Sequence, residues 1–147
     1  MKVTHQLVIE RSREHVWKAF DDPDNMKRWQ PTLMAFDHQR GVRGQPGAVS
    51  LLTYQENGKS IVMTETITVR REPEEFSGTY DNAMALNAVR NTFAALGSHR
   101  TRWTGESEFV FKGLIFRLLS PLVRGLLDRR IRTDMERFKA LVEQETA

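Results

Sequence analysis

Apolar side chains recur at helical spacing over the last part of the chain. Between residues 112 and 145 an apolar residue falls on every fourth position from Ile115 to Met135, and leucines run beside this row. Arginine, lysine and glutamate occupy most of the remaining positions. This spacing is typical of an amphipathic helix. We therefore expect one long helix here, whose apolar side the rest of the chain has to cover.

Pro121 lies inside this predicted helix. Proline lacks an amide proton, and its ring collides with the carbonyl group four residues earlier, so it bends or breaks a helix. A straight helix over residues 112–145 would also be about 50 Å long, whereas a compact domain of 147 residues is about 38 Å across. We expect a bend or break between Ser120 and Gly125, after which residues 126–143 fill the fold.

Two short helices are predicted near the start of the chain. Residues 3–9 alternate between apolar and polar side chains, which is the period of a strand with one buried face. Ser12 is suited to cap a short helix that follows this strand. Asp24 is suited to cap a second helical turn, which Pro31 ends.

From Pro31 to Phe111 the chain consists of about six strands separated by turn residues. The clearest turn is Asn57–Gly58, a pair that favours a two-residue hairpin. Short connections make consecutive strands antiparallel. The order of one strand, two short helices, about six strands and a long helix indicates the α+β class. No linker interrupts it, so we expect a single domain over residues 1–147.

Composition and charge exclude several kinds of protein. Hydrophobic residues make up 39% and charged residues 28% of the chain, which is ordinary for a globular protein. The net charge of +3 is too small to indicate a nucleic-acid partner. The absence of cysteine excludes disulfides, thiolate nucleophiles and zinc–sulfur sites. No apolar run approaches the roughly 18 residues of a membrane span, so we expect no stable membrane insertion. With no secretory signal at the start, we expect a cytoplasmic protein.

Most motifs for chemistry are missing. The nucleophile elbow, the phosphate-binding loop, the dinucleotide fingerprint and the zincin motif do not occur. Four histidines stand far apart without metal-ligand spacing, so neither a metal nor a cofactor is expected. The arginines of the terminal helix alternate with acidic residues, which favours a solvated face. A phosphate-binding or membrane-touching strip is the alternative for these arginines, and a homodimer is left open.

The order of elements and several short motifs resemble the START-like, or SRPBCC, superfamily. The motifs are Ile9 with Val16–Trp17, Asp22–Pro23, Trp29–Gln30–Pro31, Gly44–Gln45–Pro46–Gly47, Glu72–Pro73 with Phe76, Thr101–Arg102–Trp103, and Phe138–Lys139–Ala140–Leu141 with Glu143. The resemblance covers nearly the whole chain and is strongest to the polyketide cyclase/dehydrase-like and lipid-transport-like branch. It implies a helix-grip fold, in which a curved antiparallel sheet of about seven strands wraps around a long C-terminal helix. It also implies a cavity between the sheet and that helix.

Glu65 is the polar residue with most bearing on function. It lies between Met63 and Ile67 on an otherwise apolar strand face. Burying an unpaired carboxylate is costly, so an inward-facing Glu65 should have a raised pKa or a partner. The alternative is a bulge or sheet end that lets Glu65 reach water.

Other inward positions complete the predicted site. Asn91 and Ser107 are polar interruptions of apolar faces, and His5 shares a strand face with Leu7 and Ile9. A buried, satisfied histidine is one interpretation of His5, and a role at the ligand is the other. The predicted ligand-binding residues are Met63, Glu65, Ile67, Asn91, Phe93, Trp103, Ser107 and Phe109.

Two classes of function follow. The first is a module that binds a small hydrophobic or amphipathic molecule, such as a lipid, a polyketide or an aromatic compound. The alternative is a polyketide cyclase- or dehydratase-like enzyme, which needs an acid and a base that converge on the cavity. The sequence offers only Glu65 and His5 as candidate catalytic residues, which favours binding.

Overall fold

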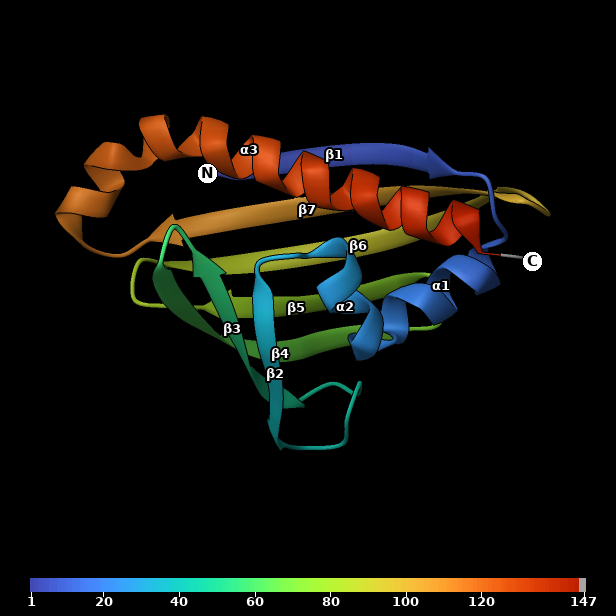
Figure 1. The fold of residues 1–147 in the computed structure, drawn as a ribbon, viewed down its shortest axis with the longest axis horizontal. Coiled ribbons are helices and arrows are strands. Elements are labelled where there is room, and N and C mark those ends of the chain that lie inside the picture. Colours follow the sequence, from blue (N-terminus) through green and yellow to red (C-terminus); the bar gives the residue numbers. More distant parts are fainter. Residues whose placement is uncertain (146–147) are drawn as a thin grey trace.

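The structure is a computed structural model that describes residues 1–145, and it consists of one curved antiparallel sheet and three helices (Figure 1). The strands and helices in chain order are β1 (Lys2–Ile9), α1 (Arg13–Asp21), α2 (Pro23–Trp29), β2 (Leu33–Arg40), β3 (Val49–Glu56), β4 (Lys59–Arg71), β5 (Glu75–Asp81), β6 (Ala85–Gly97), β7 (Arg100–Phe111) and α3 (Gly113–Gln144). The sheet order is β1-β7-β6-β5-β4-β3-β2. This is the α+β helix-grip fold expected from the sequence.

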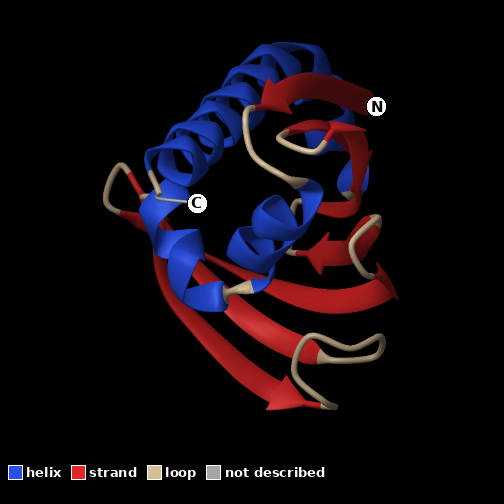
Figure 2. Cartoon of the chain, turned by 90° about the vertical axis from the view of Figure 1, so that its right-hand side faces the viewer, coloured by secondary structure: helices blue, strands red, loops and turns tan. Residues whose placement is uncertain are grey.

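The sheet is curved, and bulges interrupt the register of the β2–β3, β4–β5 and β6–β7 pairs. Each neighbouring pair is antiparallel. The β3–β4 turn is formed by Asn57 and Gly58, whose φ angles of 50° and 76° are those of the predicted two-residue hairpin. Figure 2 shows the sheet bending around the helices, which lie on its concave side.

The first two helices begin at capping residues. The Ser12 side chain accepts a hydrogen bond from the His15 backbone N–H at 3.2 Å, as predicted for α1. The predicted cap of α2 was wrong by two residues. Asp22 is the N-cap and accepts from the backbone N–H of Asp24 at 2.9 Å, and Pro23 occupies the first helical position. Proline suits that position because its missing N–H would have no partner there.

An aromatic cluster holds the second half of α3 against the sheet. Phe138 is fully buried at 0% exposure. Its ring packs edge-on against Phe20, Trp29 and Trp103 at centroid distances of 5.7, 5.3 and 5.0 Å. Edge-to-face aromatic pairs add stability beyond the area they bury. This cluster closes one end of the space between the sheet and α3.

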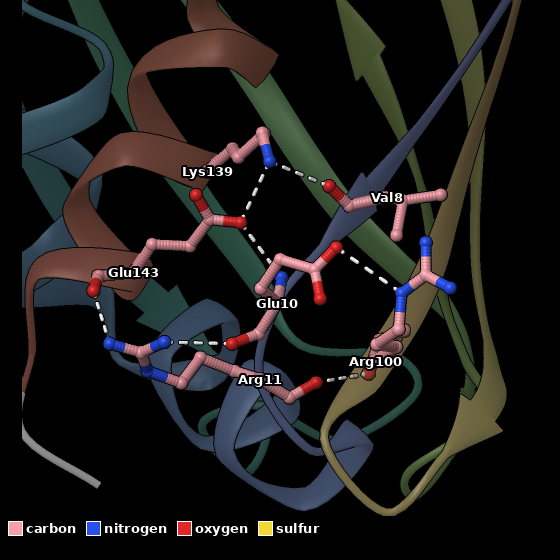
Figure 3. A network of polar contacts seen from close by, with 7 residues as sticks. Val8, Glu10, Arg11, Arg100, Lys139 and Glu143 are labelled. Atoms are coloured by element: carbon pink, nitrogen blue, oxygen red, sulfur yellow. Dashed lines mark hydrogen bonds and ion pairs between the residues drawn. The ribbon is translucent and has the colours of Figure 1, made fainter.

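Polar contacts fix the C-terminal end of α3 to the end of β1 (Figure 3). Lys139 Nζ donates to the carbonyl oxygen of Val8 at 2.9 Å and to Glu143 Oε2 at 2.7 Å. The Glu10 backbone N–H donates to the same carboxylate at 2.7 Å, and Arg11 donates to the carbonyl oxygen of Glu143. Burial alone would raise the pKa of Glu143, but the hydrogen bonds outweigh it and hold the pKa below its ordinary value.

α3 is bent, and only the half that follows the bend is packed in the core (Figure 1). The helix is continuous across Pro121 and is therefore not broken there. Figure 1 shows its N-terminal turns, in lighter orange, at an angle to the rest, which agrees with the predicted bend. The buried residues of α3 are Met135, Phe138 and Val142, all in its second half. The part of the helix after the bend thus fills the fold, as expected. Within residues 1–145 no helix is long and apolar enough to cross a membrane.

Candidate functional site

A cavity of about 460 Å³ lies between the concave face of the sheet and the helices α2 and α3. Much of its wall is apolar, with Met63 and Ile67 on β4 and Phe109 on β7 facing Leu127 and Ile131 on α3. Its volume falls in the range of about 300–1,000 Å³ that is usual for small-molecule sites. Phe20, Trp29 and Trp103 of the aromatic cluster also line the cavity.

Seven of the eight predicted ligand-binding residues line this cavity. They are Met63, Glu65, Ile67, Asn91, Trp103, Ser107 and Phe109. Phe93 lies in the core, where it stacks on Trp103 and is covered by Trp17 of α1 at a centroid distance of 6.0 Å. Their location in the cavity wall does not show that they contact a ligand, so ligand contact at these residues stays a prediction.

His5 does not belong to the cavity wall. Its Nε2 atom lies 2.8 Å from Asp128 Oδ1 on α3. The side chain is largely buried, with 13% of its surface exposed. His5 thus points inward, as its strand face indicated, but its contact is with α3. The two candidate catalytic residues, His5 and Glu65, are not brought together on one cavity wall.

A row of polar side chains crosses the concave face of the sheet. Strand register pairs Ser50 of β3 with Glu65 of β4, Glu65 with Tyr80 of β5, and Tyr80 with Asn87 of β6. Residues opposite each other in neighbouring strands point to the same face. All four line the cavity. We call Ser50, Glu65, Tyr80 and Asn87 the polar row.

Glu65 is the buried acid of this row. Only 5% of the residue is exposed. Burial raises the pKa of Glu65 because the ionised carboxylate loses its hydration, and a hydrogen bond from Tyr80 offsets part of that rise. The register around Glu65 is regular, and the nearest bulge lies farther along β4, between Ile67 and Val69. The alternative in which a bulge exposes Glu65 to water is therefore not what the structure shows.

The raised pKa of Glu65 predicts a pH-dependent stability. The folded state keeps the proton to higher pH than the unfolded chain, so the contribution of Glu65 is complete below its ordinary pKa of 4.5 and is lost as pH rises through the raised value. Glu65→Gln cannot ionise. We expect this variant to match the wild type in acid and to be more stable in alkaline buffer, by about 1.4 kcal/mol for each unit of the pKa rise.

Urea unfolding across a pH series measures this difference. Glu108→Gln, which removes a carboxylate from an exposed position on β7, is the matched control for loss of a charge. Equal stability of Glu65→Gln and wild type at every pH would contradict a buried carboxyl group at this position.

A second polar group faces the row from α3. Burial raises the pKa of Asp134 to about 6, although Arg130 and Arg137 favour its ionised form. Burial also raises the pKa of Tyr54, and the charges of Glu65 and Asp134 add to this rise. Tyr54 therefore lies near both acids. Its hydroxyl donates to Gln30 Oε1 of the α2 C-cap at 2.7 Å.

Two amides of the cavity differ in their partners. Asn91 Oδ1 accepts a hydrogen bond from the buried Trp103 Nε1 at 3.0 Å, so its oxygen is already engaged. Asn87 Oδ1 is buried and has no hydrogen-bond partner in the described part of the chain. Buried polar atoms without partners are uncommon in proteins. Asn87 thus offers a free acceptor at the end of the polar row.

Asp134 and Asn87 line the cavity but are not among the site residues predicted from the sequence. The mixed charges of the terminal helix predict a solvated position for Asp134, yet Leu127, Ile131 and Asp134 are spaced by four and three residues and share one side of the helix. That spacing was the available signal. Asn87 alternates with Val89 and Asn91 on β6, so its inward direction followed from the strand period. No cluster of three metal-binding side chains occurs in the described residues.

Comparison with known structures shows the fold to be widespread. The aromatase/cyclase Zhui from Streptomyces sp. R1128 superposes with a TM-score of 0.83 at 13% identity, over 98% of this chain and 94% of the other. A START superfamily protein from Mycobacterium smegmatis gives 0.80 at 18% identity over 99% of both chains. The protein TTHA0849 from Thermus thermophilus gives 0.79 at 16% identity over 97% of both.

Identities this low establish the common fold alone. No curated protein matches the chain. The sequence model of the family described as polyketide cyclase / dehydrase and lipid transport, however, matches residues 1–143. The match covers every strand of the sheet and all but the last residue of α3. The chain therefore belongs to this family.

Proposed function

We propose that the protein binds a small amphipathic molecule in the cavity between the sheet and α3. The apolar body of the ligand lies against Met63, Ile67 and Phe109, and its polar end meets the polar row. The observation that carries this proposal is the polar row itself. A buried acid, a tyrosine and an unpartnered amide face a cavity whose remaining wall is largely apolar.

The chemistry of the row defines the polar end of the ligand. With its pKa raised, Glu65 keeps its proton to higher pH than an exposed glutamate, and the protonated group can donate to a hydroxyl, phenol or carbonyl oxygen. Asn87 Oδ1 is free to accept a hydrogen bond. A hydroxyl or phenol group can pair with either residue because it both accepts and donates. A carbonyl satisfies Glu65 alone. We therefore favour a lipid, polyketide or aromatic ligand that carries a hydroxyl group.

A polyketide cyclase- or dehydratase-like activity is the second candidate, and one observation favours it. Two acids with raised pKa values, Glu65 and Asp134, line the same cavity from opposite walls. Titratable groups of this kind can exchange protons with a bound substrate near neutral pH. The similar Streptomyces protein is an aromatase/cyclase by name. Binding is preferred because the two candidate catalytic residues from the sequence, Glu65 and His5, do not line the cavity together.

Native mass spectrometry of protein purified without denaturation is the first experiment. A copurified small molecule of constant mass identifies the ligand and supplies the probe for the variants. We expect its affinity to fall as pH rises through the raised pKa of Glu65, because the carboxylate then stops donating its proton. Glu65→Gln is expected to bind with an affinity that no longer follows this titration.

Turnover of the identified molecule separates the two candidates. A loss of two or more orders of magnitude in rate with binding intact, in either Glu65→Gln or Asp134→Asn, assigns the protein as an enzyme. Unchanged affinity and unchanged pH dependence in Glu65→Gln would instead remove the polar row from ligand recognition.

A further inference from the structure

The first half of α3 presents an apolar surface that nothing in the described residues covers. Leucine and isoleucine side chains here are between 42% and 75% exposed. We call these residues the α3 apolar arc, and they are Leu114, Ile115, Leu118, Leu119, Leu122 and Leu126. Single exposed apolar residues are normal on a protein surface, but a contiguous group marks an interaction site.

The exposed residues occupy one side of the helix. At 3.6 residues per turn the six side chains of the α3 apolar arc fall within roughly 140° of the helix circumference. Arg117 and Arg124 fall outside the arc on the same helix circumference. Phe116 and Val123, which are less exposed, lie on the remaining side. This is the distribution of a basic amphipathic helix that lies in an interface.

The charge of this segment has one sign. From Lys112 to Leu127 the chain contains no acidic residue. Arg117 Nε donates to the carbonyl oxygen of Phe111 at 3.5 Å, and Arg124 donates to that of Lys2 at 3.4 Å. Neither guanidinium is paired with a carboxylate in the part of the chain that the structure describes. Both charges therefore remain available to a partner.

Charge decides what kind of partner fits this face. A second copy of the chain packed through the same segment would cover the leucines, but this segment has no carboxylate to pair with Arg117 and Arg124. An anionic lipid surface supplies both an apolar interior for the leucines and negative headgroups for the arginines. We propose that the first half of α3 docks the protein on anionic lipid bilayers, lying in the headgroup region without spanning the membrane.

The position of the α3 apolar arc relates this surface to the cavity. Leu126 ends the arc, and the next residue, Leu127, lines the cavity. Docking thus places the helical wall of the cavity beside the lipid surface. The docking itself does not depend on which molecule the cavity binds, so the two proposals fail or stand separately.

Vesicle cosedimentation tests the docking. Vesicles of phosphatidylcholine alone are compared with vesicles that contain about one third phosphatidylserine, at low and high salt. We expect binding to the anionic vesicles that weakens with salt. Leu118→Gln/Leu122→Gln should weaken this binding at least about tenfold. Glutamine preserves the helix but removes apolar side chains that would be buried in the bilayer. Arg117→Gln/Arg124→Gln should weaken binding about tenfold or more.

Matched controls alter other exposed side chains of the same types. Val42→Gln/Val62→Gln changes apolar residues away from α3, and Arg102→Gln changes an exposed arginine of β7. Both should bind as the wild type does. Equal binding to the two vesicle compositions, no vesicle binding, or equal losses in the controls would overturn the proposal. So would a lipid-free dimer, seen by analytical ultracentrifugation, that the leucine variant dissociates, because a second copy would then be the partner.

Discussion

Phe138→Ala is expected to lower the free energy of unfolding by about 3–5 kcal/mol. The phenylalanine ring is fully buried, and it touches aromatic residues from α1, α2 and β7 at once. Alanine leaves a hole in that cluster, and the surrounding rings belong to rigid elements that cannot close on it. Such a loss is a large part of the roughly 5–15 kcal/mol by which a typical domain is stable. Urea unfolding followed by circular dichroism measures it.

Phe116→Ala is the matched control on the same helix. Phe116 is 37% exposed and belongs to the first half of α3. Its truncation is expected to cost less than about 1 kcal/mol, because surface substitutions of this kind are usually mild. Equal losses in the two variants would contradict the division of α3 into a packed and an unpacked half.

Ser107→Phe is expected to weaken binding in the cavity by about a hundredfold or more. Ser107 is buried on the inward face of β7 between Gly105 and Phe109, and all three line the cavity. A phenyl ring there occupies space that the ligand needs. Each loss of about 1.4 kcal/mol in contact energy corresponds to a factor of ten in affinity. Titration with Nile red, an uncharged fluorescent probe of apolar sites, measures the change without knowledge of the natural ligand.

Two further measurements make the Ser107→Phe result interpretable. Ser107→Ala removes the hydroxyl without filling the cavity and is expected to bind Nile red within a few-fold of the wild type. Thermal unfolding shows whether Ser107→Phe stays folded, and we expect little loss because the ring enters existing space. A folded Ser107→Phe protein with unchanged Nile red affinity would show that the probe binds elsewhere.

The sequence predicted the fold well because each element has its own periodicity and end signals. Alternation placed Glu65 on the inward face of its strand, and Asn57–Gly58 located a hairpin, since both depend on near neighbours in the chain. Phe93 shows the limit of this reasoning. Its face was predicted correctly, but whether an inward residue meets a cavity or a helix depends on where α1 packs. Trp17 of α1 covers Phe93.

The candidate site was less predictable because its residues meet only in three dimensions. Asp134 lies on a helix whose charges alternate, and only the packing of α3 over the sheet turns it toward Glu65 and Tyr54. The missing partner of Asn87 Oδ1 depends on every residue around it and leaves no trace in the local sequence. His5 was placed inward, but its contact with Asp128 joins residues from opposite ends of the chain.

In the proposed function, ligand recognition by the polar row depends on complete and accurate folding. The row takes one residue from each of four strands, so three separate strand pairings must align before it exists. A slip of one residue in any of these hairpins turns that strand's side chain to the outer face of the sheet. A molecule with a misaligned hairpin can still enclose an apolar cavity, but it lacks the complete polar row that orients the ligand. Binding of the natural ligand therefore reports that each central hairpin has its native register. Binding of an apolar dye does not report this.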